Sequence, residues 1–112
     1  MKHTIQNLEK SVVLRPQNFL PIKRNQILSL TFCRREKESA AFFSFDSGEG
    51  ISKESADQDT LYVVLSGGAQ IEIESDAHIV CAGQGIAVPA GVPHGVHATQ
   101  PVQLMKIAVG EI

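Results

Sequence analysis

The sequence contains little cysteine, little excess charge and no long apolar run, and each absence narrows what the protein can be. Its 112 residues carry a formal net charge of -2, which gives no electrostatic reason to expect a nucleic acid or an anionic membrane as partner. No stretch approaches the roughly 20 apolar residues that a membrane span needs, and the first ten residues lack the apolar core of a signal peptide. We therefore expect a cytoplasmic protein with no nucleic-acid partner and no membrane partner.

The two cysteines, Cys33 and Cys81, lie far apart, and neither belongs to a CxxC pattern or a Cys/His cluster. This spacing gives no support to a zinc finger or a redox motif, and disulfides are uncommon in a reducing compartment. A free cysteine usually behaves as a small apolar residue. We expect both thiols to be buried in the core.

Strand patterns recur at short intervals, with almost no helical pattern between them. Residues 28–33 and 41–45 alternate apolar and smaller side chains on either side of a charged link, which predicts a hairpin. A continuous apolar run at 61–65 precedes a glycine turn, and in 70–74 isoleucines alternate with polar residues. Many short strands with glycine-rich corners are typical of an all-β sandwich or barrel. Further short strands are predicted at 78–81, 86–88 and 102–109.

The chain has the length of one domain, 1–112, and its first 25 residues differ from the rest. Val12, Val13 and Leu14, followed by Pro16 and Pro21, predict a short edge strand and an extended arm over 1–25. In a small barrel, such an arm covers an open end or crosses to a second subunit.

Residues 83–94, GQGIAVPAGVPH, combine a strand, a proline-glycine corner and one histidine at fixed spacing. With Gly83, Pro89, Gly91 and His94 in register, this stretch resembles the second conserved motif of the cupin superfamily, whose histidine is normally a metal ligand. Residues 42–109 as a whole resemble a small single-domain cupin of the cupin 2 conserved barrel, or RmlC-like, type. The resemblance implies a double-stranded β-helix, or jelly-roll barrel, and a homodimer. The matching passages are FSFDSGEGIS, LYVVLSGGAQIEI and AGQGIAVPAGVPHGV.

The first cupin motif is degenerate in this chain. In metal-binding cupins it supplies two histidines and a glutamate, and Glu54, Ala56 and Thr60 stand at these positions here. Strand alternation predicts that these three positions face inward with His94, whereas Asp59 faces outward unless a bulge intervenes. One carboxylate and one imidazole hold a divalent ion poorly, so no iron, manganese, nickel or zinc is favoured. An inward Asp59 would restore a site of Glu54, Asp59 and His94.

His94 is the strongest candidate for a functional residue, as a ligand-binding or catalytic group in a cavity or as a satisfied wall residue. Glu54 is either an exposed loop carboxylate or an inward carboxylate hydrogen-bonded to His94. Thr60 offers a hydroxyl, and Tyr62 belongs to the core or to the wall of a ligand site. His97 has the opposite strand parity to His94 and is predicted to face outward.

These residues lead to two functional hypotheses. The favoured one is a binding module that holds a small organic molecule inside the barrel, with His94 and Glu54 as polar anchors. The alternative is a cupin enzyme of the dioxygenase, isomerase, epimerase or decarboxylase type, which works either with a rebuilt metal site or without metal and with His94 as a general base. Fold does not decide between them.

Overall fold

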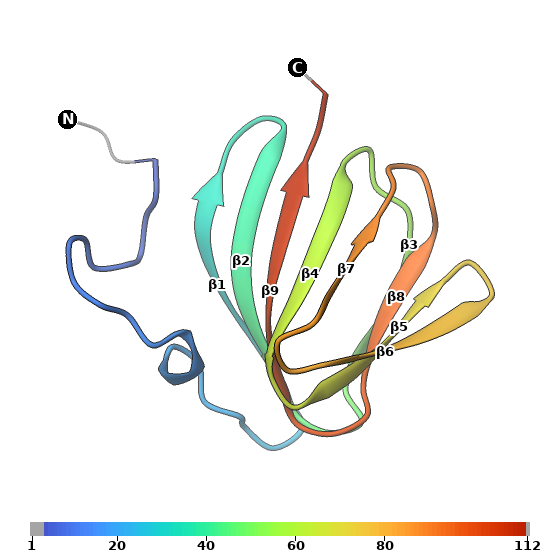
Figure 1. Ribbon diagram of the computed structural model, residues 1–112, viewed down its shortest axis with the longest axis horizontal. Helices are drawn as coiled ribbons and strands as arrows, with labels where there is room; N and C mark the ends of the chain where they lie inside the picture. Colours follow the sequence, from blue (N-terminus) through green and yellow to red (C-terminus); the bar gives the residue numbers. More distant parts are fainter. Residues whose placement is uncertain (1–3, 112) are drawn as a thin grey trace.

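The computed structural model describes residues 4–111, and its regular secondary structure consists of β-strands and one short 3-10 helix (Figure 1). No helix among these residues is long and apolar enough to cross a membrane. The prediction of an all-β fold is confirmed. The elements are η1 (Pro16–Asn18), β1 (Ile27–Arg34), β2 (Glu38–Phe45), β3 (Gly50–Glu54), β4 (Asp59–Ser66), β5 (Gly68–Ile73), β6 (Asp76–Cys81), β7 (Gly85–Val88), β8 (His94–Ala98) and β9 (Val102–Val109).

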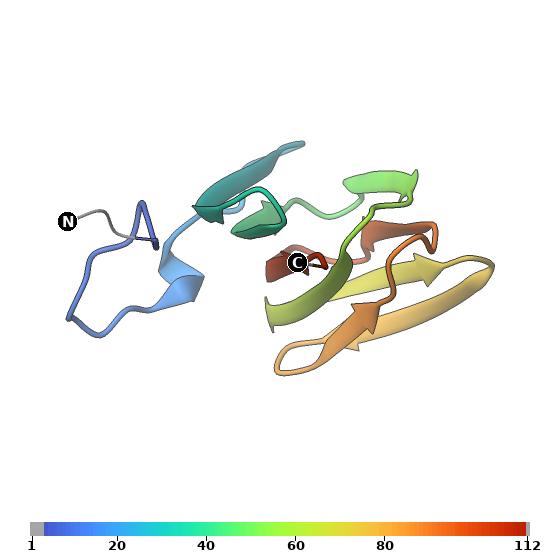
Figure 2. The same ribbon diagram turned by 90° about the horizontal axis from the view of Figure 1, so that it is seen from above.

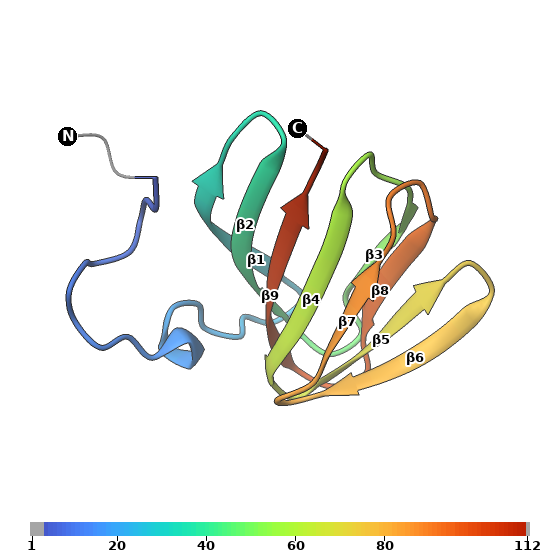
Figure 3. The same ribbon diagram turned by 45° about the horizontal axis from the view of Figure 1, so that its top comes forward.

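The strands form two antiparallel sheets that face each other (Figures 2 and 3). The five-stranded sheet has the order β1-β2-β9-β4-β7, and the four-stranded sheet has the order β3-β8-β5-β6. Four of the connections between sheets lie at the lower edge in Figure 1, and the β3–β4 and β7–β8 connections lie at the upper edge. One lower connection requires glycine at Gly67, because φ is +77° and an added Cβ would lie 1.9 Å from the Pro101 carbonyl oxygen.

Most strands lie where the sequence pattern predicts them, and two were not assigned from it. The predicted hairpin of residues 28–33 and 41–45 is confirmed as β1 and β2, which pair antiparallel. The unassigned strands are β3 and β8, which lie side by side in the four-stranded sheet. All five residues of β3 are exposed, so it shows no apolar alternation. The short β8, HGVHA, contains two histidines and a glycine and so lacks a strand signature.

The core lies between the two sheets, and both contribute to it by alternation. In β4 and β9 every second side chain points inward, whereas in β5 the isoleucines point inward and Glu72 lies on the outer face, paired with Lys53. This packing leaves room for a pocket toward the upper edge. The buried core residues are Phe45, Tyr62, Val64, Ala69, Ile71, Val80, Val88, Val96, Ala98, Val102 and Leu104.

The N-terminal arm packs on the outer face of β1 and β2. Phe19 meets Phe42 edge to face with ring centroids 5.0 Å apart, and Phe42 stacks on Phe32 at 4.8 Å. The Ser44 hydroxyl donates to the Pro21 carbonyl oxygen at 2.8 Å. Apolar and polar contacts therefore both tie the second half of the arm to the sheet of its own chain.

The edge strand predicted at Val12–Leu14 is wrong. These residues form no strand, and Val13 is 96% exposed. The apolar triplet is bounded by Ser11, which has a left-handed φ of 63°, and by Pro16, which begins η1. Both features interrupt an extended chain. The segment of extended backbone between them is therefore too short to pair with a sheet edge.

The prediction that both cysteines are buried is wrong for Cys81. Cys81 is exposed and Cys33 is partly buried. Cys81 is the last residue of β6, directly after the buried Val80, and adjacent residues of a strand point to opposite faces. Because β6 is an edge strand with its outer face in solvent, the thiol is exposed.

Candidate functional site

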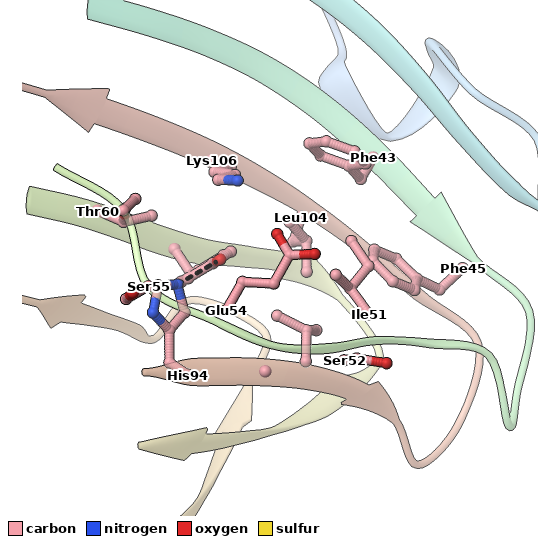
Figure 4. Close-up of a pocket in the computed structure, with 14 residues that line it drawn as sticks. Phe43, Phe45, Ile51, Ser52, Glu54, Ser55, Thr60, His94, Leu104 and Lys106 are labelled. Atoms are coloured by element: carbon pink, nitrogen blue, oxygen red, sulfur yellow. Dashed lines mark hydrogen bonds between the residues drawn. The ribbon is translucent and has the colours of Figure 1, made fainter. Parts of the chain in front are cut away.

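A pocket of about 80 Å³ lies between the sheets, near the upper connections (Figure 4). Its inner walls are apolar and come from β2 and β9 through Phe43, Phe45 and Leu104. Its outer side is formed by exposed residues of β3 and of the loop after it, so the pocket opens to solvent there. The polar and charged side chains that line it are Ser52, Glu54, Ser55, Thr60, Tyr62, His94 and Lys106.

His94 begins β8, is 9% exposed and makes two hydrogen bonds through its ring. Its Nδ1 lies 3.1 Å from the Val92 carbonyl oxygen, and its Nε2 lies 3.0 Å from the Tyr62 hydroxyl oxygen. A carbonyl oxygen only accepts hydrogen bonds, so Nδ1 carries the proton and donates it to Val92. In the neutral imidazole, Nε2 then has a lone pair and accepts a hydrogen bond from the Tyr62 hydroxyl. The two contacts therefore favour the tautomer with the proton on Nδ1.

Tyr62 reaches His94 from the opposite sheet. It lies on β4, where alternation buries it with Thr60 and Val64, and it is 5% exposed. Burial raises the pKa of the Tyr62 phenol from 10.0 to about 12, because the phenolate would lose its hydration. The hydroxyl therefore keeps its proton at neutral pH and serves as the donor to Nε2. The rings meet edge to face with centroids 5.6 Å apart.

Glu54 is the last residue of β3 and is paired in register with His94. The register shifts between Ile51 and Glu54, which places one extra residue in β3. Without this bulge Lys53 would take the inward position, whereas in the structure its ammonium group pairs with Glu72 on the outer face. Figure 4 shows the Glu54 carboxylate directed into the pocket toward β9. The His94 ring bonds to Tyr62 and Val92, so the alternative of a Glu54–His94 hydrogen bond is not what the structure shows.

The other residues at the degenerate first motif separate into two groups. Ala56 and the buried Thr60 line the pocket with Glu54. Asp59 does not line this pocket, and its Oδ1 accepts a hydrogen bond from the Ala90 backbone amide at 2.7 Å. The structure thus brings Glu54, Thr60, Tyr62 and His94 together and leaves Asp59 outside.

Comparison with known proteins identifies the family. A family model of the cupin domain matches residues 41–109, which is more than half of the chain. This chain belongs to the cupin family. The small single-domain cupin barrel that the sequence resembled is therefore confirmed.

Similar proteins come from several bacteria. Protein SCO3923 of Streptomyces coelicolor is 35% identical over 68 residues, and this match covers 61% of the present chain and 65% of that protein. The solved structure of SPY1581 from Streptococcus pyogenes, a protein of unknown function, has a TM-score of 0.97 at 32% identity and covers 99% of this chain and 97% of that one. The cupin superfamily protein DSY2733 from Desulfitobacterium hafniense has a TM-score of 0.91 at 25% identity, with 96% and 98% covered.

The donor groups of this cupin do not fit the metal site that the family implies. Residues 4–111 contain no cluster of three or more His, Cys, Asp or Glu side chains that could hold an ion. The His94 Nε2 lone pair, which a metal would need, accepts the Tyr62 hydroxyl instead. Glu54 alone remains as a carboxylate in the pocket. Iron, manganese, nickel and zinc need more imidazole or carboxylate ligands than these.

Lys106 lines the pocket of this cupin and was missed in the sequence analysis. It lies on β9, in register with Tyr62 of β4, and its Nζ is 6.0 Å from the centroid of the Tyr62 ring. A signal was available, because Val102, Leu104 and Ala108 have the same strand parity and are buried. Lysine in an inward position of a barrel strand is uncommon enough to mark a site.

Proposed function

We propose that this cupin binds a small organic molecule in the pocket between its sheets, without a metal ion, and that His94 and Tyr62 form the polar end of the site. The observation that supports this function is the His94–Tyr62 hydrogen bond, which lies in the lining of a cavity whose inner walls are apolar. Ligand sites typically combine such apolar walls with a few fixed polar groups. The Tyr62 hydroxyl also gives the His94 Nε2 nitrogen a fixed partner, which a metal ion would otherwise be.

The size of the pocket limits the ligand. About 80 Å³ is well below the roughly 300–1,000 Å³ of sites that enclose drug-sized molecules. The exposed residues of β3 leave one side open, so a longer ligand can extend into solvent past Ile51 and Ser52. We therefore expect a ligand of a few heavy atoms, or the end of a larger one.

Binding accounts for the site better than acid-base catalysis does. Both ring nitrogens of His94 are engaged, so the imidazole offers no free lone pair to a substrate. The raised pKa of Tyr62 keeps its phenol protonated and equally unable to accept a proton at neutral pH. An enzyme of the epimerase or isomerase type would first have to break the Tyr62–His94 hydrogen bond.

A ligand screen with matched histidine variants tests this function. Small organic acids, amines and neutral polar molecules are screened against the wild type by saturation-transfer NMR, and hits are titrated by calorimetry. His94→Gln shortens the polar end of the site, and we expect about a tenfold or larger loss of affinity. His97→Gln is the control, because His97 lies on the same strand but is exposed on the outer face.

Two results would overturn the binding function. One is a screen in which no compound binds the wild type, and the other is equal affinity of wild type and His94→Gln for every hit. Chemical turnover of a hit that is lost in both His94→Gln and Tyr62→Phe would instead establish the enzyme alternative.

The homodimer that the family resemblance implies stays a prediction. Val12 and Val13 are 50% and 96% exposed on the arm and are apolar, so a second copy is the partner we expect them to meet. Light scattering coupled to size exclusion decides between a mass near 12.1 kDa and twice that mass.

A further inference from the structure

Lys106 and Glu54 place opposite charges in the same pocket from opposite sheets. Lys106 lies on β9 of the five-stranded sheet, and Glu54 lies on β3 of the four-stranded sheet. Figure 4 shows the Glu54 carboxylate directed toward β9. The side-chain ion pairs within 4.0 Å in the described part of the chain involve other residues. The pocket therefore has a positive wall and a negative wall, and neither charge is neutralised by a direct protein partner.

We propose that the ligand is dipolar, with an ammonium group that binds Glu54 and a carboxylate that binds Lys106, joined by a short aliphatic spacer. This inference rests on the proposed function of the same site. It assigns the ligand class and adds Lys106, which had no role in the sequence analysis, as an anchor.

The charges of Glu54 and Lys106 favour a dipolar ligand over a singly charged one, through both attraction and repulsion. A simple carboxylate would be attracted by Lys106 but repelled by the nearby Glu54. A simple ammonium ion would be attracted by Glu54 but repelled by Lys106. A dipolar molecule satisfies both walls at once, and complementary charges of this kind give specificity. An uncharged ligand would leave both protein charges unpaired.

Apolar residues of the same pocket fit the spacer. Phe45 and Leu104 are almost fully buried and line the pocket, and Ile51 lines it from β3. A methylene chain that lies on these side chains removes apolar surface from water. The pocket thus combines a negative group, a positive group and apolar surface, which complement the amine, the carboxylate and the methylene chain of an amino acid with a terminal amine.

Calorimetric titration with a series of matched small molecules tests the inference. The dipolar probes are glycine, β-alanine, γ-aminobutyrate and ε-aminocaproate, and the singly charged probes are butyrate and butylamine. We expect at least one dipolar probe to bind wild type about tenfold or more tightly than either singly charged probe, because a charge-assisted hydrogen bond is lost with each missing group.

Four variants locate the effect. Glu54→Gln is expected to remove the advantage of the amine group, and Lys106→Met the advantage of the carboxylate. Lys106→Arg keeps the charge and should retain carboxylate binding, which guards against a loss caused by misfolding. The control is Lys53→Met, because Lys53 pairs with Glu72 on the outer face of the barrel and should leave every affinity unchanged.

Three outcomes would overturn the dipolar ligand. They are equal affinity for dipolar and singly charged probes, equal affinity of wild type and the Glu54→Gln and Lys106→Met variants for the best probe, and no binding of any dipolar probe. If the earlier screen yields a neutral ligand that depends on His94, the binding function stands and the dipolar class alone is rejected.

Discussion

The two neighbouring strands that carry the cupin motifs, β8 and β3, are built in opposite ways. β8 lies inside the four-stranded sheet, between β3 and β5, and four of its five residues are buried. β3 is an edge strand of that sheet, all its residues are exposed, and its register shifts once against β8. His94 thus lies on a strand that pairs with a neighbouring strand on both sides, whereas Glu54 lies on a strand that pairs with a neighbour on one side only.

This difference explains which part of the site is fixed and which part can adapt. His94 has two hydrogen bonds of its own, to Tyr62 and Val92, in addition to the pairing of its strand. The Glu54 carboxylate has a defined direction but forms no side-chain hydrogen bond or ion pair with residues 4–111 (Figure 4). Loss of His94 should therefore disturb the fold, and loss of Glu54 should change only what the pocket binds.

Among the variants that test this difference between β8 and β3, we expect His94→Ala to have the largest effect on the free energy of unfolding. The change leaves the Tyr62 hydroxyl and the Val92 carbonyl without their partner and opens a cavity between the sheets. We expect a loss of about 3 kcal/mol in the free energy of unfolding, measured by urea denaturation. His97→Ala on the exposed face of β8 should change it by less than about 0.5 kcal/mol. Equal losses in the two variants would contradict the asymmetry.

We expect the second-largest effect from Gly95→Ala, which tests the contact between β8 and β3. An added Cβ on Gly95 would lie 2.9 Å from the Ile51 carbonyl oxygen and 3.1 Å from the Lys53 amide nitrogen, both backbone atoms of β3. Gly95→Ala must therefore displace β3, and we expect it to cost about 1–3 kcal/mol in the free energy of unfolding. The amide NMR signals of β3 should shift more than those of β5, and an unperturbed β3 would show that the strands are less tightly apposed.

Tyr62→Phe tests the hydrogen bond that anchors His94. At neutral pH we expect a loss of about 1 kcal/mol in the free energy of unfolding, because Nε2 keeps its lone pair and loses its donor. Separately from this hydrogen bond, burial raises the folded pKa of Tyr62 to about 12 from 10.0, so the unfolded state ionises first and the wild type loses stability as pH rises from about 10 toward 12. The slope approaches roughly 1.4 kcal/mol per pH unit in that window.

The variant Tyr62→Phe should lack this part of the alkaline slope. Urea denaturation of both proteins at a series of pH values measures it. Parallel curves from neutral pH to about pH 12 would mean that the folded state does not shift the titration of the Tyr62 phenol.

The smallest effect is expected for Glu54→Ala on the edge strand. Because Glu54 is exposed and its carboxylate has no ion-pair partner within 4.0 Å among residues 4–111, the free energy of unfolding should change by less than about 0.5 kcal/mol. Thermal denaturation followed by circular dichroism is sufficient. A loss comparable to that of His94→Ala would show that Glu54 supports the fold.

The same contrast shows why one half of the site could be predicted from the sequence. The second motif has residue types with narrow backbone roles, such as Gly83 with φ +84° and Gly91 with φ +80°, so its pattern indicated the barrel and His94 together. Alternation placed Glu54 and Thr60 correctly on the pocket side, although the bulge in β3 was needed for Glu54.

Other features of the site could not be predicted from the sequence because they depend on tertiary structure. Tyr62 and His94 are 32 positions apart and lie on different sheets, so their hydrogen bond follows from the register and separation of the sheets, which no local pattern encodes. The outward turn of Asp59 is stabilised by Ala90 in another connection. Lys106 is different, since the alternation of β9 already placed it inward and the interpretation passed over it.

The central claim is that Tyr62, and not a metal ion, is the partner of the His94 Nε2 nitrogen. Elemental analysis of untagged protein purified without chelators tests it most directly, with wild type and His94→Gln measured side by side. We expect less than about a tenth of an equivalent of iron, manganese, nickel or zinc in both. About one equivalent in the wild type that is lost in His94→Gln would contradict the account.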